Sequence, residues 1–228
     1  MHYVLGDIHG MQESFDAILK QIDLQPEDTL FVIGDVIDRG AYGIPLLRRI
    51  MKMPNAKMLL GNHEYMMLQA IEHPSKETIG VWYHNGGSFT HENFKHLRKE
   101  YKYEILDFLH SLPLNLSVTV EGRDYLLVHG VPEDWYQPGS WYDNPAEYAV
   151  WERLKKGDWT ESERTLIFGH TPTIYYQRSK PLSVWYSGNM IGIDCGAPYG
   201  EEGRLACLRL EDGKVFYSDT GMAHKNNL

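Results

Sequence analysis

The sequence has little cysteine and no long apolar run, and both absences narrow the class of protein. Cys195 and Cys207 are the only cysteines among 228 residues, which is too few for a disulfide framework. No run of about 18 apolar residues occurs, so we expect no membrane span and no membrane partner. The N-terminus lacks the basic and long apolar segments of a signal peptide, which predicts a cytoplasmic location.

Positive charge is also scarce. The chain has 22 Lys and Arg against 31 Asp and Glu, a formal net charge of −9. Because proteins that bind nucleic acid usually carry a basic face, we expect no nucleic-acid partner. The acidic balance does not exclude phosphorylated substrates, since bound divalent metals can reverse the local field. The length predicts one domain over residues 1–228.

The order of apolar patterns indicates the fold class. In the first half, short apolar runs alternate with segments of helical periodicity, which favours parallel strands covered by helices. Residues from about 80 to 112 are polar, aromatic and mostly helical in pattern, which predicts a small helical cap inserted in the domain. The second half is rich in strand patterns, one of them expected at 182–185. Together these patterns predict an α/β (α+β) protein with either one mixed sheet or two packed sheets, flanked by helices.

Five short segments share one arrangement, in which an apolar run is followed at once by Gly or His and then by polar residues. In an α/β sheet the carboxyl ends of the strands line the ligand crevice, so these segments are expected to meet at one rim. The segments are Gly6-Asp7-Ile8-His9-Gly10, Gly34-Asp35-Val36-Ile37-Asp38-Arg39-Gly40, Gly61-Asn62-His63-Glu64, His129-Gly130 and Gly169-His170-Thr171-Pro172.

These segments offer a set of metal-ligating side chains. Mixed nitrogen and oxygen donors suit manganese, iron, zinc or a similar ion, and the lack of cysteine argues against a purely structural zinc site. About six donors are too many for one four-coordinate ion, and two ions sharing a carboxylate are a known device for phosphoester hydrolysis. The candidate ligands are Asp7, His9, Asp35, Asn62, His129 and His170.

The motif series resembles the calcineurin-like metallophosphoesterases, and within them the phosphoprotein phosphatase branch. That branch includes bacterial serine/threonine protein phosphatases and symmetrical diadenosine tetraphosphatases. The resemblance extends from Gly6 to about Leu210. It implies an α/β (α+β) fold with two packed mixed β-sheets, a β-sandwich, flanked by helices. It also implies a metal-dependent phosphatase with two divalent ions, for which manganese is our expectation and iron or zinc the alternatives.

The resemblance also implies a role for each residue. Asp7, His9 and Asp35 would hold the first metal, and Asp35 would bridge to a second metal held by Asn62, His129 and His170. His63 would be the general acid, oriented by Asp38. Arg39, Arg153 and Asn62 would contact the substrate phosphate. Arg153 is included because Trp151-Glu152-Arg153 is similar to a Trp-x-Arg segment of bacterial members.

Departures from the family pattern bear on the substrate. Pro172 stands where nuclease and cyclic-phosphodiesterase relatives carry a second His, which favours the phosphatase branch. Leu60, directly before Gly-Asn-His, is similar to the corresponding segment of tetraphosphatases. Glu64 differs, because those proteins tend to have Asp at this position. We therefore expect a phosphoprotein or small phosphorylated substrate, with a dinucleoside polyphosphate as the alternative and a non-catalytic phosphate-binding module as the least favoured.

One further segment is similar to bacterial relatives. Trp82 with Asn85-Gly86-Gly87 fits a Trp-x-x-Asn-Gly-Gly pattern. We favour a helix-ending turn with a packed tryptophan, and the alternative is a cap that shapes the substrate mouth.

Overall fold

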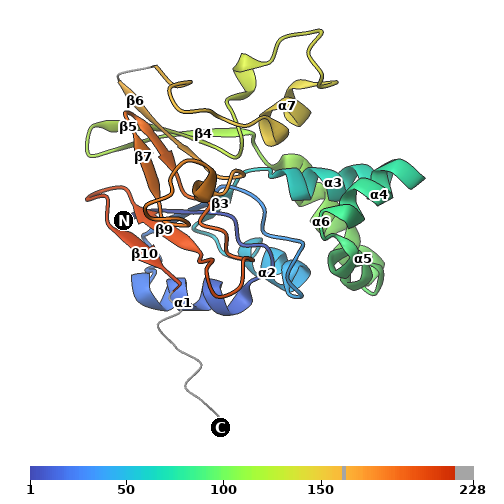
Figure 1. The fold of residues 1–228 in the computed structure, drawn as a ribbon. Helices are drawn as coiled ribbons and strands as arrows, with labels where there is room; N and C mark the ends of the chain where they lie inside the picture. The colour runs from blue at the N-terminus through green and yellow to red at the C-terminus, as the bar shows by residue number, and fades with distance from the viewer. Residues whose placement is uncertain (161–162, 219–228) are drawn as a thin grey trace.

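Two five-stranded sheets form the centre of the structure, a computed structural model that describes residues 1–160 and 163–218 (Figure 1). The first sheet has the order β10-β9-β1-β2-β3, in which β1, β2 and β3 are parallel. The second has the order β4-β5-β6-β8-β7, in which β5, β6 and β8 are parallel. Both are mixed, because β9 and β4 pair with their neighbours antiparallel.

The strands of the first sheet are β1 (His2–Leu5), β2 (Thr29–Val32), β3 (Ala56–Met58), β9 (Ala206–Arg209) and β10 (Val215–Tyr217). Those of the second are β4 (Asn115–Val120), β5 (Arg123–Val128), β6 (Arg164–Phe168), β7 (Trp185–Ser187) and β8 (Met190–Gly192). The α-helices are α1 (Gln12–Ile22), α2 (Gly43–Ile50), α3 (Asn62–Glu72), α4 (Lys76–His84), α5 (Ser88–Lys95), α6 (Lys99–Ser111) and α7 (Pro145–Trp151).

The period-two alternation of strand side chains divides the core into layers. In β1, Val4 faces the other sheet and packs in one cluster with Leu127 of β5 and Ile167 of β6. Its neighbours Tyr3 and Leu5 belong to a second cluster, on the face that α1, α2 and α3 cover. The predicted β-sandwich flanked by helices is therefore confirmed.

The expected strand at 182–185 was placed too early. The backbone of Leu182 has a φ of 54°, which breaks an extended run. The Val184 N–H donates to the side-chain hydroxyl of Tyr217 rather than to the backbone of a neighbouring strand. Pairing with β8 begins only at Trp185. Apolar composition alone marked this segment as a strand, whereas its backbone partners lie elsewhere.

Helices α4, α5 and α6 occupy the region for which a cap was expected, and Figure 1 shows them grouped with α3 at one side of the molecule. Their apolar side chains do not form a separate core. Trp82, Phe94, Ile105 and Leu109 are buried in the same cluster as the helix-facing residues of β1. In the described part of the chain, no helix is long and apolar enough to cross a bilayer.

Candidate metal and phosphate site

The five polar segments meet where parallel strands of the two sheets end. Asp7 and His9 follow β1, Asp35 follows β2, and Asn62 begins α3 after β3. On the other sheet, His129 follows β5 and His170 follows β6. These six side chains are all buried, with at most 6% of their surface exposed.

The turns that carry these residues use unusual backbone geometry. Positive φ values occur at His9 (51°), Asp35 (50°), Asp38 (69°), Arg39 (63°) and His170 (61°). This region is uncommon for residues other than glycine and costs free energy, and such conformations concentrate at functional sites. The surrounding contacts must therefore hold these turns in place.

One group of donors gathers around Asn62 at the start of α3. The Oδ1 atom of Asn62 lies 3.0 Å from Nε2 of His129 and 2.9 Å from Nδ1 of His170. An oxygen of Asp35 lies 3.4 Å from the same His129 nitrogen. A close approach is possible here because residue 61 is glycine: a Cβ at that position would lie 2.3 Å from the Asp35 carboxylate.

Each of the three predicted histidine ligands turns one ring nitrogen toward the site and hydrogen-bonds the other to a backbone carbonyl. Such a bond fixes the tautomer and leaves the opposite nitrogen as a lone-pair donor for a metal. The bonds run from His9 Nδ1 to Ile37 O (3.2 Å), from His129 Nδ1 to Ile33 O (2.8 Å) and from His170 Nε2 to Trp151 O (3.1 Å).

The donor set fits a divalent metal. Burial lowers the pKa of His129, and burial together with the neighbouring imidazoles lowers the pKa of His9 and His170 well below its usual value. Neutral rings have no proton left for Asn62 Oδ1, so acceptor atoms converge there without a hydrogen between them. A cation satisfies such an arrangement, and deprotonated ligands are the form that binds it.

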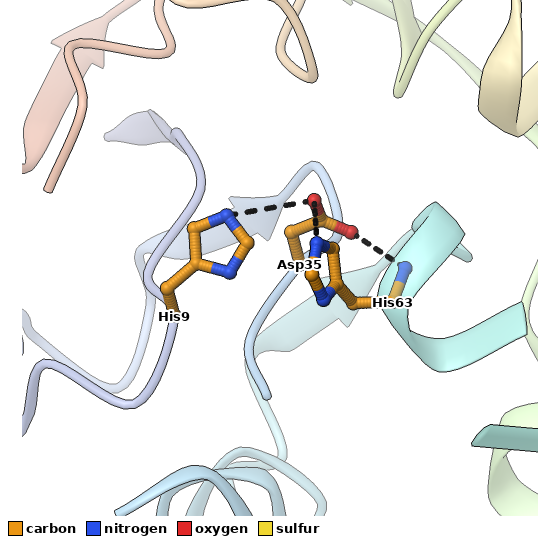
Figure 2. Close-up of side chains that lie close together, drawn as sticks. All are labelled: His9, Asp35 and His63. Carbon is orange, nitrogen blue, oxygen red and sulfur yellow. Dashed lines mark hydrogen bonds and ion pairs between the residues drawn. The ribbon is translucent and has the colours of Figure 1, made fainter. Parts of the chain in front are cut away.

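A second group joins His9, Asp35 and His63 (Figure 2). An Asp35 oxygen lies 3.6 Å from His9 Nε2 and 3.9 Å from His63 Nε2. Asp35 thus contributes to both groups. Asp7, which the resemblance assigns to the first metal, belongs to neither of these two groups; its carboxylate is buried and accepts the backbone N–H of His170 at 3.0 Å.

His63 is held differently from the three predicted ligand histidines. Its Nδ1 lies 2.7 Å from the Asp38 carboxylate, and both side chains are fully buried. Its Nε2 lies 3.2 Å from the guanidinium of Arg39, which also contacts His9. Burial alone would lower the pKa of His63, but Asp35 and the hydrogen bond to Asp38 raise it above its usual value.

An open pocket of about 690 Å³ adjoins this group. Arg39 and Arg153 line it together with the lysines 155 and 156 and three tyrosines, Tyr175, Tyr176 and Tyr199. The Arg153 guanidinium donates to the carbonyl of His170 at 3.2 Å and to the Thr171 hydroxyl at 3.0 Å, so it is fixed at the edge of the site. Two guanidinium groups, which bind anions well, therefore line the pocket.

Sequence reasoning assigned no role to Glu64, which is fully buried beneath the site. Its two oxygens accept backbone N–H groups from Gly61 and from three consecutive residues of the Asp35 turn, at 2.8 to 3.2 Å; the donors are Asp35, Val36, Ile37 and Gly61. The sequence signals only one of these bonds: a Glu three residues after an N-cap is one half of a capping box, which accounts for the bond from Gly61 but not for those from the Asp35 turn.

Residues 3–199 match the family model described as calcineurin-like phosphoesterase. The chain belongs to this family. It is 30% identical over 224 residues to serine/threonine-protein phosphatase 2 of Escherichia coli (strain K12), covering 92% of each chain. It is also 32% identical to a symmetrical bis(5'-nucleosyl)-tetraphosphatase of Acidovorax ebreus, over 58% of this chain and 45% of that protein.

Solved structures agree on the fold of this calcineurin-like phosphoesterase. A metallophosphoesterase from Sphaerobacter thermophilus superimposes with a TM-score of 0.58 at 17% identity, covering 95% of this chain and 86% of that one. The chain is a metal-dependent phosphatase, as the sequence predicted, and its family uses divalent metal ions. The names of its relatives differ in substrate between phosphoproteins and dinucleoside polyphosphates.

Proposed function

We propose that this phosphatase hydrolyses phosphomonoesters at a dinuclear metal site and acts as a bacterial-type serine/threonine protein phosphatase. The observation that carries the proposal is the pair of donor groups sharing Asp35, next to the buried His63–Asp38 pair. The six ligands in this proposal are Asp7, His9, Asp35, Asn62, His129 and His170. When bound, two divalent ions supply hydroxide near neutral pH and polarise the phosphoryl group.

The residues of the chain provide the rest of the chemistry. Arg39 and Arg153 present planar donors that match the non-bridging phosphoryl oxygens, and Asn62 reaches the same phosphate. His63 Nε2 faces Arg39, so a phosphate bound there brings its leaving oxygen close to that nitrogen. His63 donates its proton to the leaving oxygen, and Asp38 fixes the ring so that the proton is on the correct side.

The overall similarity supports the protein phosphatase reading, because the E. coli serine/threonine-protein phosphatase 2 is matched over 92% of its length. Manganese is the metal we propose, since the mixed nitrogen and oxygen donors suit it, as they also suit iron and zinc. The single domain over residues 1–228 and the cytoplasmic location stay predictions.

A specific observation favours a second candidate, a symmetrical dinucleoside polyphosphate hydrolase. Besides the arginines, the pocket is lined by Lys155, Lys156 and Tyr175, a residue that is 73% exposed. Cationic side chains can hold additional phosphates, and an exposed aromatic ring can stack on a base.

The two candidates are separated by comparing kcat/KM on a phosphoserine peptide and on diadenosine tetraphosphate, with the protein reloaded with manganese, magnesium or nickel. The protein phosphatase proposal expects the higher value on the phosphopeptide. A higher value on diadenosine tetraphosphate would favour the second candidate. Metal binding without turnover of either substrate would contradict both and favour a phosphate-binding module.

A further inference from the structure

Four hydrogen bonds attach the helical region α4–α5 to the turn that carries Asp38 and Arg39. The Asp38 N–H donates to the hydroxyl of Thr90 at 3.0 Å. The Arg39 N–H donates to the carbonyl of Gly86 at 3.1 Å. The other two are donated by the side chains of Trp82, to the Asp38 carboxylate, and of Asn93, to the carbonyl of Ala41.

The bond from Trp82 differs from the rest because it reaches a side chain of the proposed proton-donor pair. The indole N–H donates to Oδ2 of Asp38 at 2.8 Å, and this same oxygen binds His63 Nδ1 at 2.7 Å. Within the described residues, Asp38 Oδ1 has no hydrogen-bond partner. The orientation of the carboxylate therefore depends on two donors, His63 itself and Trp82.

Trp82 is itself fixed in position. Its ring has no exposed surface and is packed in the main core cluster. The backbone of Gly87 packs directly against the indole, since a Cβ at this position would lie 2.2 Å from the indole nitrogen. A buried indole N–H needs an acceptor, and Asp38 provides it. The two strained residues Asp38 and Arg39 need such support, because their positive φ values are unfavourable for side chains of their kind.

We infer that Trp82 is a positioning residue for the phosphatase reaction: its indole N–H holds the Asp38 carboxylate in the orientation that aims His63 at the leaving oxygen. The inference rests on the proposed function, because it takes His63 as the proton donor. It gives the α4–α5 region a part in the chemistry in addition to any contact with substrate.

The test compares leaving groups. Proton donation matters most for poor leaving groups, so a phosphoserine peptide depends on His63 strongly and p-nitrophenyl phosphate only weakly. Trp82→Phe keeps an aromatic ring but removes the N–H. We expect kcat on the phosphopeptide to fall at least about tenfold, and kcat on p-nitrophenyl phosphate to fall less than about threefold, with little change in KM or bound metal.

Two further variants guard against a merely structural effect. Trp159→Phe is the matched control, because Trp159 also donates an indole hydrogen bond, to the carbonyl of Arg164 at 2.9 Å, away from the site. It should leave the ratio of the two rates unchanged. Gly87→Ala keeps Trp82 but displaces its indole, and it should reproduce the selective loss. An equal loss on both substrates in Trp82→Phe, or no loss, would overturn the inference.

His63→Asn separates failure of the inference from failure of the proposed function. If His63→Asn shows the selective loss and Trp82→Phe does not, only the inference is wrong. If His63→Asn shows no selectivity, both are wrong. A measurement without turnover completes the test: the NMR resonance of the His63 Nδ1–H, assigned by its absence in His63→Asn, should shift in Trp82→Phe and stay in place in Trp159→Phe. An unmoved resonance in Trp82→Phe would contradict the inference whatever the substrate.

Discussion

His63, after the first sheet, and His129 and His170, after the second, are the same residue type with opposite chemistry. His9 follows β1, but its pKa is lowered like those of His129 and His170. On the side of the second sheet, burial lowers the pKa of His129 and, with help from His129, that of His170. On the side of the first sheet, burial acts on His63 too, but Asp35 and Asp38 outweigh it and raise the pKa. Metal binding needs the neutral form and proton donation the charged form, so the neighbours divide the roles.

The difference in pKa follows the hydrogen-bond partner of the ring nitrogen that points away from the site. His129 and His170 donate to neutral backbone carbonyls, of Ile33 and Trp151, which orient a ring without charging it. His63 faces the carboxylate of Asp38, which stabilises an imidazolium. The hydrogen-bond partner of each histidine therefore indicates whether the ring suits metal binding or proton donation.

The largest effect is expected from removing the carboxylate of Asp35, which belongs to both donor groups. Asp35→Asn keeps the size of the side chain but removes the negative charge common to the two donor groups. We expect fewer than two ions per chain and a loss of activity of about 1,000-fold or more, because metal ions stabilise the transition state by several kcal/mol. Metal analysis and kcat on p-nitrophenyl phosphate check this. Full metal content with normal turnover would contradict it.

A direct contrast of the two sides comes next in size. His63→Asn should lower kcat on phosphoserine peptides by about 100-fold or more while both metals stay bound, because it removes only the proton donor. His170→Asn should instead reduce metal content. The measurement also tests whether His63, which lies in a donor group with His9 and Asp35, is a ligand. Loss of metal in His63→Asn would reassign it from acid to ligand.

The site shows what the sequence could and could not predict. Polar segments such as Gly-Asp-x-His-Gly come directly after apolar runs in the chain, and parallel strands bring such segments together. The fold and the convergence of Asn62, His129 and His170 were therefore predictable. The roles of Trp82 and Glu64 were not, because each depends on a contact with a turn 29 to 44 residues away. No local pattern specifies such a contact.

Removing the hydrogen bonds that Glu64 accepts from the Asp35 turn should have a smaller but measurable effect on stability. In Glu64→Gln an amide N–H₂ replaces an oxygen that accepts backbone N–H groups of the Asp35 turn, so donors would face donors. We expect the free energy of unfolding to fall by about 1–3 kcal/mol, as for an unsatisfied buried polar group. Urea denaturation measures it. Glu92→Gln, an exposed residue of α5, is the control and should match the wild type.

The smallest expected effect is on the pH dependence of stability in metal-free protein. The pKa of His170 is lowered in the folded protein, so below about pH 6.5 the histidine binds a proton in the unfolded chain but not in the folded one. The free energy of unfolding therefore falls there by at most about 1.4 kcal/mol per pH unit for each such histidine. His63, with its raised pKa, stabilises the fold at low pH and loses this contribution as the pH rises through its folded value.

Urea titrations at several pH values, with a chelator present, separate the two histidines. Relative to wild type, His170→Asn should reduce the decline below about pH 6.5, and His63→Asn should reduce the decline above it. The same difference curve for both variants would show that the two sides do not differ in protonation.

The shared hydrophobic cluster of α4–α6 and β1 limits how this enzyme can be redesigned. Phe94, Ile105 and Leu109 are buried together with Leu5 of β1, so excising these helices would expose the interior of the first sheet. An exchanged segment would have to restore both the packing under the sheet and the hydrogen bonds to the Asp38 turn. The stability of the fold and the geometry of the His63–Asp38 pair would therefore change together.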